Sequence, residues 1–176
     1  MKENYKVLMN KVKAFVFDVD GVLTNGNLNI TLEGQPIRNM NSKDGYALQL
    51  AIKKGYKVGI ITGGKAEGVK EALATVGVKD IYTSSHFKLD SWNDFLAIYE
   101  EDLKAENVLY MGDDIPDYLV MERAGIACCP SNAATEIKNI SHYVSPIHGG
   151  NGCVRDVIEQ TLKVQENWML EEDFTW

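Results

Sequence analysis

Basic charge is scarce in this sequence, and so are cysteines. The 176 residues include 18 Lys and Arg against 25 Asp and Glu, which gives a net charge of -7. Nucleic acids and anionic membranes bind basic surfaces, so we expect neither as a partner. Only three cysteines are present, Cys128, Cys129 and Cys153, without Cys-x-x-Cys spacing. This pattern argues against a zinc site and a disulfide framework.

Long apolar runs are also missing. No segment reaches the roughly 18 apolar residues that a membrane-spanning helix requires, and no signal-peptide core follows the first residues, Met1 to Tyr5. We therefore expect a cytoplasmic protein with reduced thiols. With 45% hydrophobic residues, the chain is long enough to bury its own core, and we predict a single domain over residues 1–176.

The sequence does contain a regular alternation of apolar runs and amphipathic segments. Buried strands are predicted at 14–17, 58–61, 81–84, 108–111, 126–129 and 143–144, and helices at 44–55, 66–76, 92–103, 116–124 and 153–165. This rhythm predicts an α/β fold of the Rossmann-like, doubly wound type, in which helices cover both faces of a mostly parallel sheet.

Two segments stand outside this alternation. Residues 26–41 alternate apolar and polar side chains around a Glu33-Gly34 turn, which predicts an inserted β-hairpin. A two-stranded hairpin is marginally stable alone, so we expect it to pack on something, for example a neighbouring subunit. The tail, about 166–176, includes two tryptophans and Phe174, and that much aromatic surface predicts a docking place.

Acidic residues follow two of the predicted strands. Asp18 and Asp20 come after strand 14–17, and Asp113 and Asp114 come after strand 108–111. Because the carboxyl ends of parallel strands meet at one edge, we expect these carboxylates to lie close together. Crowded carboxylates repel one another unless a cation is present, and hard oxygen ligands select Mg²⁺. The sequence therefore predicts a magnesium site.

Groups suited to a phosphate follow the other strands. Thr62 and Gly63 are small enough for backbone amides to approach an anion, and Lys88 supplies a positive charge. With a metal neutralising the phosphate, one carboxylate can attack while another handles the leaving-group proton. The set favours phosphoryl transfer. His148, in a glycine-rich loop, is either a substrate contact or a solvated side chain.

Four separated motifs resemble those of the haloacid dehalogenase-like phosphatases. They match in order and spacing: Asp18-x-Asp20-Gly-x-x-Thr24, Thr62-Gly63, Lys88 and Gly112-Asp113-Asp114-x-x-Asp117. From about residue 12 to 163 the chain is similar to the cap-less branch that contains 3-deoxy-D-manno-octulosonate 8-phosphate phosphatase. The predicted hairpin, Asp44-Gly45 and the segment from Gly149 to Arg155 extend this resemblance.

The resemblance implies roles for the two leading carboxylates and their partners. Asp18 would be the nucleophile that forms an aspartyl-phosphate, and also a Mg²⁺ ligand. Asp20 would be the general acid/base and would bind the metal through its backbone carbonyl. Thr62, with Gly63, and Lys88 would bind the phosphoryl group.

The resemblance also implies supporting residues. Asp113 would be a direct metal ligand, and Asp114 and Asp117 would support the site, through water or by orienting Lys88. A simple turn carboxylate is the other interpretation of Asp117. Arg155 would bind the substrate carboxylate, directly or across an interface, unless it is a surface arginine.

The implied assembly is a homotetramer whose neighbouring subunits cover the active site in place of a cap. The implied substrate is a phosphorylated 3-deoxy-2-keto sugar acid of lipopolysaccharide biosynthesis. The eight-carbon compound, 3-deoxy-D-manno-octulosonate 8-phosphate, is the first choice. Gly64, however, stands where Arg or Glu is usual, and Thr83 to Lys88 departs from the common Gln-Gly and Asp-Lys pattern. The nine-carbon acid 2-keto-3-deoxy-D-glycero-D-galacto-nononate 9-phosphate, another small phosphate ester, and a catalytically quiet oligomeric binding module are the alternatives.

Overall fold

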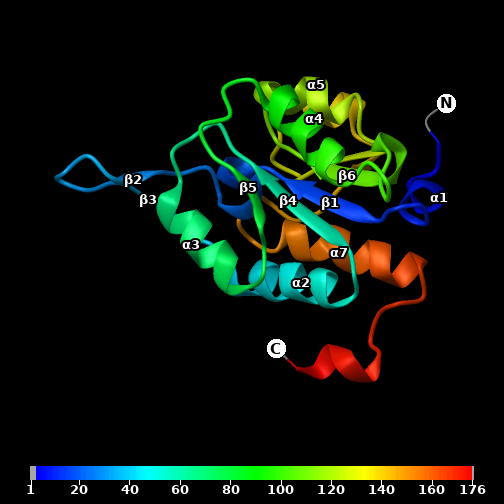
Figure 1. The fold of residues 1–176 in the computed structure, drawn as a ribbon. Coiled ribbons are helices and arrows are strands. Elements are labelled where there is room, and N and C mark those ends of the chain that lie inside the picture. The colour runs from blue at the N-terminus through cyan, green and yellow to red at the C-terminus, as the bar shows by residue number, and fades with distance from the viewer. Residues whose placement is uncertain (1–2, 176) are drawn as a thin grey trace.

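A six-stranded, wholly parallel sheet forms the centre of the computed structural model, which describes residues 3–175 (Figure 1). Its strand order is β5-β4-β1-β6-β7-β8, and each neighbouring pair is parallel. The strands are β1 Ala14–Phe17, β4 Lys57–Ile61, β5 Asp80–Tyr82, β6 Val108–Met111, β7 Ile126–Cys129 and β8 Tyr143–Val144. The predicted parallel sheet is thereby confirmed.

Helices cover both faces of the sheet, as predicted (Figure 1). On one face lie α1 Tyr5–Met9, α2 Ser42–Lys53, α3 Glu67–Thr75 and α7 Cys153–Val164. On the other lie α4 Lys88–Ile98, α5 Tyr118–Met121 and α6 Thr135–Ile140. Single 3₁₀ turns occupy Ala105–Asn107, Ile115–Asp117 and Glu171–Phe174. Residues 3–175 contain no separate cap domain.

The two faces have separate hydrophobic cores, because side chains alternate along each strand. Phe15 and Phe17 of β1 point into the core beneath α2 and α7, whereas Val16 points into the core beneath α4. Gly59 of β4 faces α4, where a Cβ atom would lie 2.9 Å from the Phe95 ring. A glycine at this position therefore lets the aromatic ring of α4 pack directly on the sheet.

Two helix predictions differ from the structure, and one helix of the structure was not predicted. The 92–103 helix ends at Ile98, and Leu103 is buried from the following turn instead. The 116–124 helix consists of a 3₁₀ turn and the short α5. Helix α6 was not predicted, since Ile137 is its only fully buried residue and one apolar contact gives no periodicity.

The predicted hairpin is present as β2 Asn29–Ile30 and β3 Pro36–Ile37, an antiparallel pair that projects from the body of the molecule (Figure 1). Its apolar side chains face solvent: Ile30 is 61% exposed and Leu32, at the tip, is fully exposed. Such a surface needs a covering partner to be favourable in water.

The tail folds back on α2 and α7 of its own chain. The Lys54 ammonium lies 2.7 Å from Oδ1 of Asp173, and the Tyr46 hydroxyl donates to the backbone carbonyl of Asp173. Trp168 packs against the main core, whereas Phe174 is 68% exposed. The expected docking place is therefore intramolecular for part of the tail, and Trp176 lies outside the described residues. A search of the described helices for one long and apolar enough to span a bilayer finds none.

Candidate active site

The acidic strand ends meet in a hollow of about 340 Å³ at the carboxyl edge of the sheet. Asp18 follows β1, Thr62 follows β4 and Asp113 follows β6 by two residues. The hollow is lined by Asp18, Asp20, Gly26, Thr62, Gly63, Gly64, Lys88, Asp113, Asp114, Pro116 and Asp117. The fold thus brings together every predicted catalytic, phosphate-binding, metal-binding and supporting residue except Arg155.

Lys88 is the buried cation of this hollow. It begins α4, and its ammonium lies 2.8 Å from Oδ1 of Asp18 and 2.7 Å from Oδ1 of Asp117. Burial alone would lower the pKa of Lys88, but the two carboxylates outweigh burial and raise that pKa above its ordinary value. Lys88 therefore stays charged at neutral pH, fixed beside Asp18.

Asp117 holds this arrangement in place. Its Oδ1 accepts hydrogen bonds from Lys88 at 2.7 Å and from the Tyr110 hydroxyl at 2.6 Å. Its Oδ2 accepts from the backbone amides of Asp113 at 3.1 Å and Asp114 at 3.4 Å. With both oxygens engaged, Asp117 positions the lysine and the strand end, beyond the role of a simple turn carboxylate.

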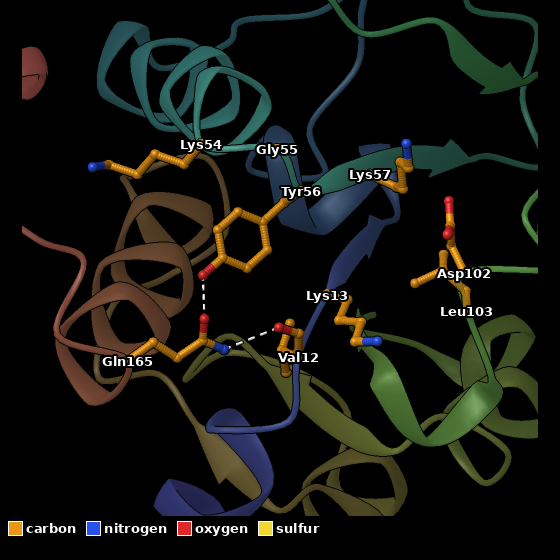
Figure 2. Close-up of a pocket in the computed structure, with 9 residues that line it drawn as sticks. All are labelled: Val12, Lys13, Lys54, Gly55, Tyr56, Lys57, Asp102, Leu103 and Gln165. Atoms are coloured by element: carbon orange, nitrogen blue, oxygen red, sulfur yellow. Dashed lines mark hydrogen bonds between the residues drawn. The ribbon is translucent and has the colours of Figure 1, made fainter.

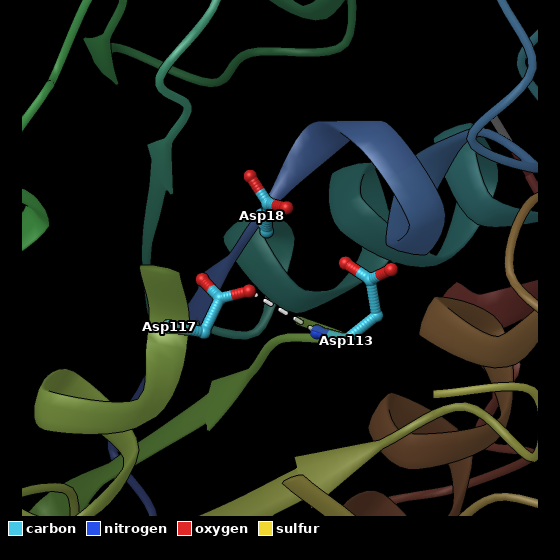
Figure 3. A group of neighbouring side chains, drawn as sticks. All are labelled: Asp18, Asp113 and Asp117. Carbon is cyan, nitrogen blue, oxygen red and sulfur yellow. Dashed lines mark hydrogen bonds between the residues drawn. The ribbon is translucent and has the colours of Figure 1, made fainter. Parts of the chain in front are cut away.

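Asp18, Asp113 and Asp117 form a carboxylate cluster whose oxygens lie within 4.8 Å of one another (Figure 3). Burial, aided by the charge of Asp117, raises the pKa of Asp18 well above its usual range and that of Asp113 to about 7. Oδ1 of Asp113 is buried and has no hydrogen-bond partner among the described residues. An unpartnered carboxylate oxygen beside a second carboxylate fits a cation.

The turn after Asp18 closes tightly over this cluster. Gly21 has φ +93°, and a Cβ atom there would lie 2.0 Å from Oδ2 of Asp113. The Thr24 hydroxyl accepts hydrogen bonds from the amides of Gly21 at 3.4 Å and Gly26 at 3.2 Å. The Asp-x-Asp-Gly-x-x-Thr motif is therefore explained by local geometry: glycine permits the approach and threonine ties the turn.

Thr62 and Gly63 form the opposite wall of the hollow. The buried Thr62 hydroxyl accepts a hydrogen bond from the Gly64 amide at 3.4 Å, and its backbone carbonyl accepts one from the Ser85 amide at 3.0 Å. These bonds hold the threonine at the end of β4. The hydroxyl is thereby presented to the same space as Asp18 and Lys88.

Asp20 has a partner that the sequence analysis did not identify. Arg38, just after β3 of the hairpin, donates from Nε to Oδ1 of Asp20 at 2.7 Å and from Nη2 to Oδ2 at 3.0 Å. Its Nη1 donates to the Lys65 carbonyl at 3.2 Å. The hydrogen bonds to Asp20 raise the pKa of Arg38. In the sequence, the only indication of this contact is the positive charge of Arg38 just after the second strand of the predicted hairpin.

Arg155 and His148 lie outside the hollow. Arg155 is in the first turn of α7, where it donates to Glu159 at 3.1 Å and lies over the rings of Trp168 and Tyr46. Within one chain, its visible role is to hold the tail. Its predicted contact with a substrate carboxylate stays a prediction. His148 is exposed in the loop before α7.

A second hollow, of about 380 Å³, lies at the opposite edge of the sheet (Figure 2). Lys13 and Lys57 flank it, and Gln165 spans it from the end of α7. The Gln165 side chain accepts from the Tyr56 hydroxyl and donates to the carbonyls of Met9 and Val12. The Gln165 amide and the Tyr56 hydroxyl are therefore satisfied by partners of the same chain within this hollow.

Known proteins with similar sequences are phosphatases, in agreement with the residues gathered in this hollow. No family model matches the chain. It is 34% identical over 154 residues to the 3-deoxy-D-manno-octulosonate 8-phosphate phosphatase KdsC of Escherichia coli K12, covering 88% of this chain and 81% of that protein. The KdsC of Yersinia pestis is 31% identical over 155 residues, which cover 88% of this chain and 82% of that protein.

Solved structures show the same similarity. A crystal structure of the Yersinia pestis phosphatase matches with a TM-score of 0.90 and 29% identity, over 95% of this chain and 89% of that one. The Moraxella catarrhalis phosphatase, in complex with a magnesium ion, a phosphate ion and KDO, matches with a TM-score of 0.88 and 29% identity, over 93% and 92% of the two chains. The resemblance seen in the motifs is confirmed: the chain belongs to the 3-deoxy-D-manno-octulosonate 8-phosphate phosphatase family of haloacid dehalogenase-like phosphoric monoester hydrolases.

Proposed function

We propose that this protein is a Mg²⁺-dependent phosphatase that hydrolyses 3-deoxy-D-manno-octulosonate 8-phosphate through an aspartyl-phosphate at Asp18. The observation that carries the proposal is the shared hollow in which Asp18, Lys88 and Asp113 meet. Membership of the family supports the substrate, and the magnesium, phosphate and KDO held by the Moraxella catarrhalis relative support both the metal and the sugar acid.

In the first half-reaction, a carboxylate oxygen of Asp18 attacks the phosphorus atom. The bond between phosphorus and the sugar oxygen breaks, and Asp20 gives a proton to that oxygen so that it leaves as a hydroxyl. Lys88 lies 2.8 Å from Asp18 and offsets the negative charge of the transferring group. Thr62 and the amide near Gly63 bind the other phosphoryl oxygens.

In the second half-reaction, water attacks the phosphorus of the aspartyl-phosphate. Asp20 accepts a proton from the water, the bond between phosphorus and Asp18 breaks, and inorganic phosphate is released with both aspartates restored. Mg²⁺, which Asp18, Asp113 and the Asp20 carbonyl would hold, supplies charge neutralisation of the phosphoryl group. The unpartnered Oδ1 of Asp113 fits this ligand role.

The substrate is tested by comparing kcat/KM over a panel of phosphate esters. The panel contains the eight-carbon and nine-carbon sugar-acid phosphates and several sugar phosphates, because discrimination is expressed in that ratio. We expect the eight-carbon acid to be hydrolysed fastest and exhaustive chelation to stop the reaction, with Mg²⁺ restoring it. Faster turnover of another ester would change the substrate, and phosphate release unaffected by chelation would contradict the metal's role.

We also propose a cytoplasmic homotetramer in which the hairpin packs on a neighbouring subunit. The exposed Leu28, Ile30, Leu32 and Ile37 side chains give the hairpin an apolar surface. The three cysteines are buried and form no disulfide in the described part of the chain, which suits a reducing compartment. Multi-angle light scattering tests the assembly. A tetramer that becomes a smaller species on Leu32→Asp is the expected result, and a wild-type monomer would contradict it.

A further inference from the structure

The turn after β1, residues 19–24, has close neighbours on two sides. On one side Gly21 lies against Asp113, where a Cβ atom would be 2.0 Å from Oδ2 of that carboxylate. On the other side lie residues 149–152, here called the glycine segment, which lead into α7. A Cβ atom on Gly149 would be 1.8 Å from the Gly21 carbonyl oxygen, so the two backbones touch. The turn is thus held between a proposed metal ligand and the glycine segment.

Hydrogen bonds also join the glycine segment to the turn. The Gly150 amide donates to the Val22 carbonyl at 2.9 Å, and the Cys153 thiol donates to the same oxygen at 3.2 Å. Gly150 has φ +71°, and a Cβ atom there would be 2.4 Å from the Asn25 amide nitrogen. Because no flexible side chain separates the two backbones, a displacement of the glycine segment is transmitted directly to the turn.

Two side chains from other elements hold the glycine segment in place. At the end nearer α7, Oδ1 of Asp44 accepts a hydrogen bond from the Arg155 amide at 2.7 Å. At the other end, Oδ1 of Asn132 accepts one from the Gly149 amide at 2.9 Å. Asn132 is an exposed residue of the loop between β7 and α6. Its carboxamide therefore anchors the glycine segment at the residue that touches the turn.

The loop that contains Asn132 also reaches the opposite side of the turn. The Ala134 amide donates to the Asp113 carbonyl at 2.9 Å. The contacts thus close a ring, in which Asp113 lies against Gly21, the turn rests on the glycine segment, and the loop binds both the segment and Asp113. Within this ring, the Asn132 carboxamide is a link that a substitution can remove without altering Gly21 or Asp113.

We propose that Asn132 is a positioning residue for phosphoryl transfer: it fixes the glycine segment, which keeps the turn that carries Asp20 in register with Asp113. This inference rests on the proposed function and deepens it. Catalysis falls steeply when a reacting group is misplaced by a fraction of an ångström. The phosphate-binding residues Thr62 and Lys88 lie at other strand ends, so removal of the Asn132 carboxamide should affect kcat and leave KM almost unchanged.

The test combines kinetics with hydrogen–deuterium exchange, which does not depend on activity. Asn132→Ala should lower kcat for the sugar-acid phosphate about three- to tenfold, the value of one neutral hydrogen bond. It should also speed amide exchange in a peptide that spans residues 19–25 by a similar factor. Asn132→Asp, which keeps an acceptor oxygen for the Gly149 amide, should restore both kcat and protection from exchange to nearly the wild-type values.

Asn4→Ala is the matched control. Oδ1 of Asn4 also accepts from a backbone amide at 2.9 Å, that of Lys6, but it caps α1, outside the residues that line the hollow. This variant should change neither kcat nor exchange in the turn. Wild-type kcat and exchange in Asn132→Ala, or an equal loss of kcat in Asn132→Asp, would overturn the positioning role. Wild-type protein that releases no phosphate would instead overturn the proposed function, while exchange in the turn still reports on Asn132, so the two failures are distinguished.

Discussion

Replacing Asp117 by Asn tests whether this carboxylate positions Lys88. Asp117 accepts four hydrogen bonds, two on each oxygen, from Lys88, Tyr110 and the amides of Asp113 and Asp114. Asparagine has nearly the same volume but only one acceptor oxygen. In either orientation its NH₂ group faces two donors, so two buried hydrogen bonds are lost without a cavity.

The cost follows from these numbers. Each lost bond that leaves a buried donor unpaired costs about 1–3 kcal/mol, and the change also weakens a buried ion pair, so we expect Asp117→Asn to lower the free energy of unfolding by about 3–5 kcal/mol. Chemical denaturation measures this. Lys88 keeps Asp18 as a partner at 2.8 Å but loses its second support. The kcat should therefore fall more than KM rises.

Tyr110→Phe is the matched control, because it removes one donor to Asp117 and leaves the carboxylate in place. Its expected cost is about 1 kcal/mol, with little loss of activity. The contrary result would be an Asp117→Asn protein of wild-type stability that needs at least about tenfold more Mg²⁺ for half-maximal activity. Asp117 would then be primarily a metal ligand.

Two further predictions concern the turn after Asp18 and the buried Asp44 of α2, whose Oδ1 accepts a hydrogen bond from the Arg155 amide in the first turn of α7 at 2.7 Å. Gly21→Ala should abolish activity and weaken Mg²⁺ binding measured by calorimetry, because its Cβ would overlap Asp113, whereas Gly34→Ala, also at positive φ but with open space, should remain active. Burial raises the pKa of Asp44 from 3.8 to about 6, so the folded state holds its proton more tightly. The unfolding free energy of wild type relative to Asp44→Asn should thus fall by up to about 3 kcal/mol as pH rises from 4 to 6; a rise over that window in denaturant titrations would refute it.

The sequence predicted the sheet and the assembly of the site because both follow from local patterns. Strands buried on two faces are continuous apolar runs, and their carboxyl ends share one edge. The proximity of Asp18, Thr62 and Asp113 could therefore be predicted from the sequence alone. Lys88 joined them because it follows the third predicted strand, so that it lies at the same edge of the sheet.

The partner of Asp20 could not be predicted in this way. Arg38 is 18 positions away, on a hairpin whose strands are two residues each, and its path over the site depends on tertiary packing. The contacts of Arg155 with Trp168 and Tyr46 could not be predicted for the same reason, because they depend on how the tail folds back. Contacts made by irregular segments leave no periodic trace in the sequence.

Attack by Asp18 is tested most sharply by phosphate release from 3-deoxy-D-manno-octulosonate 8-phosphate, compared between wild-type protein and Asp18→Asn, both with Mg²⁺. We predict steady turnover by the wild type and none by the variant, which should remain folded because asparagine fills the same space at the end of β1. Acid-quenched wild-type protein should also carry phosphate on a peptide that contains Asp18. Full activity of Asp18→Asn would contradict an aspartyl-phosphate mechanism at this residue.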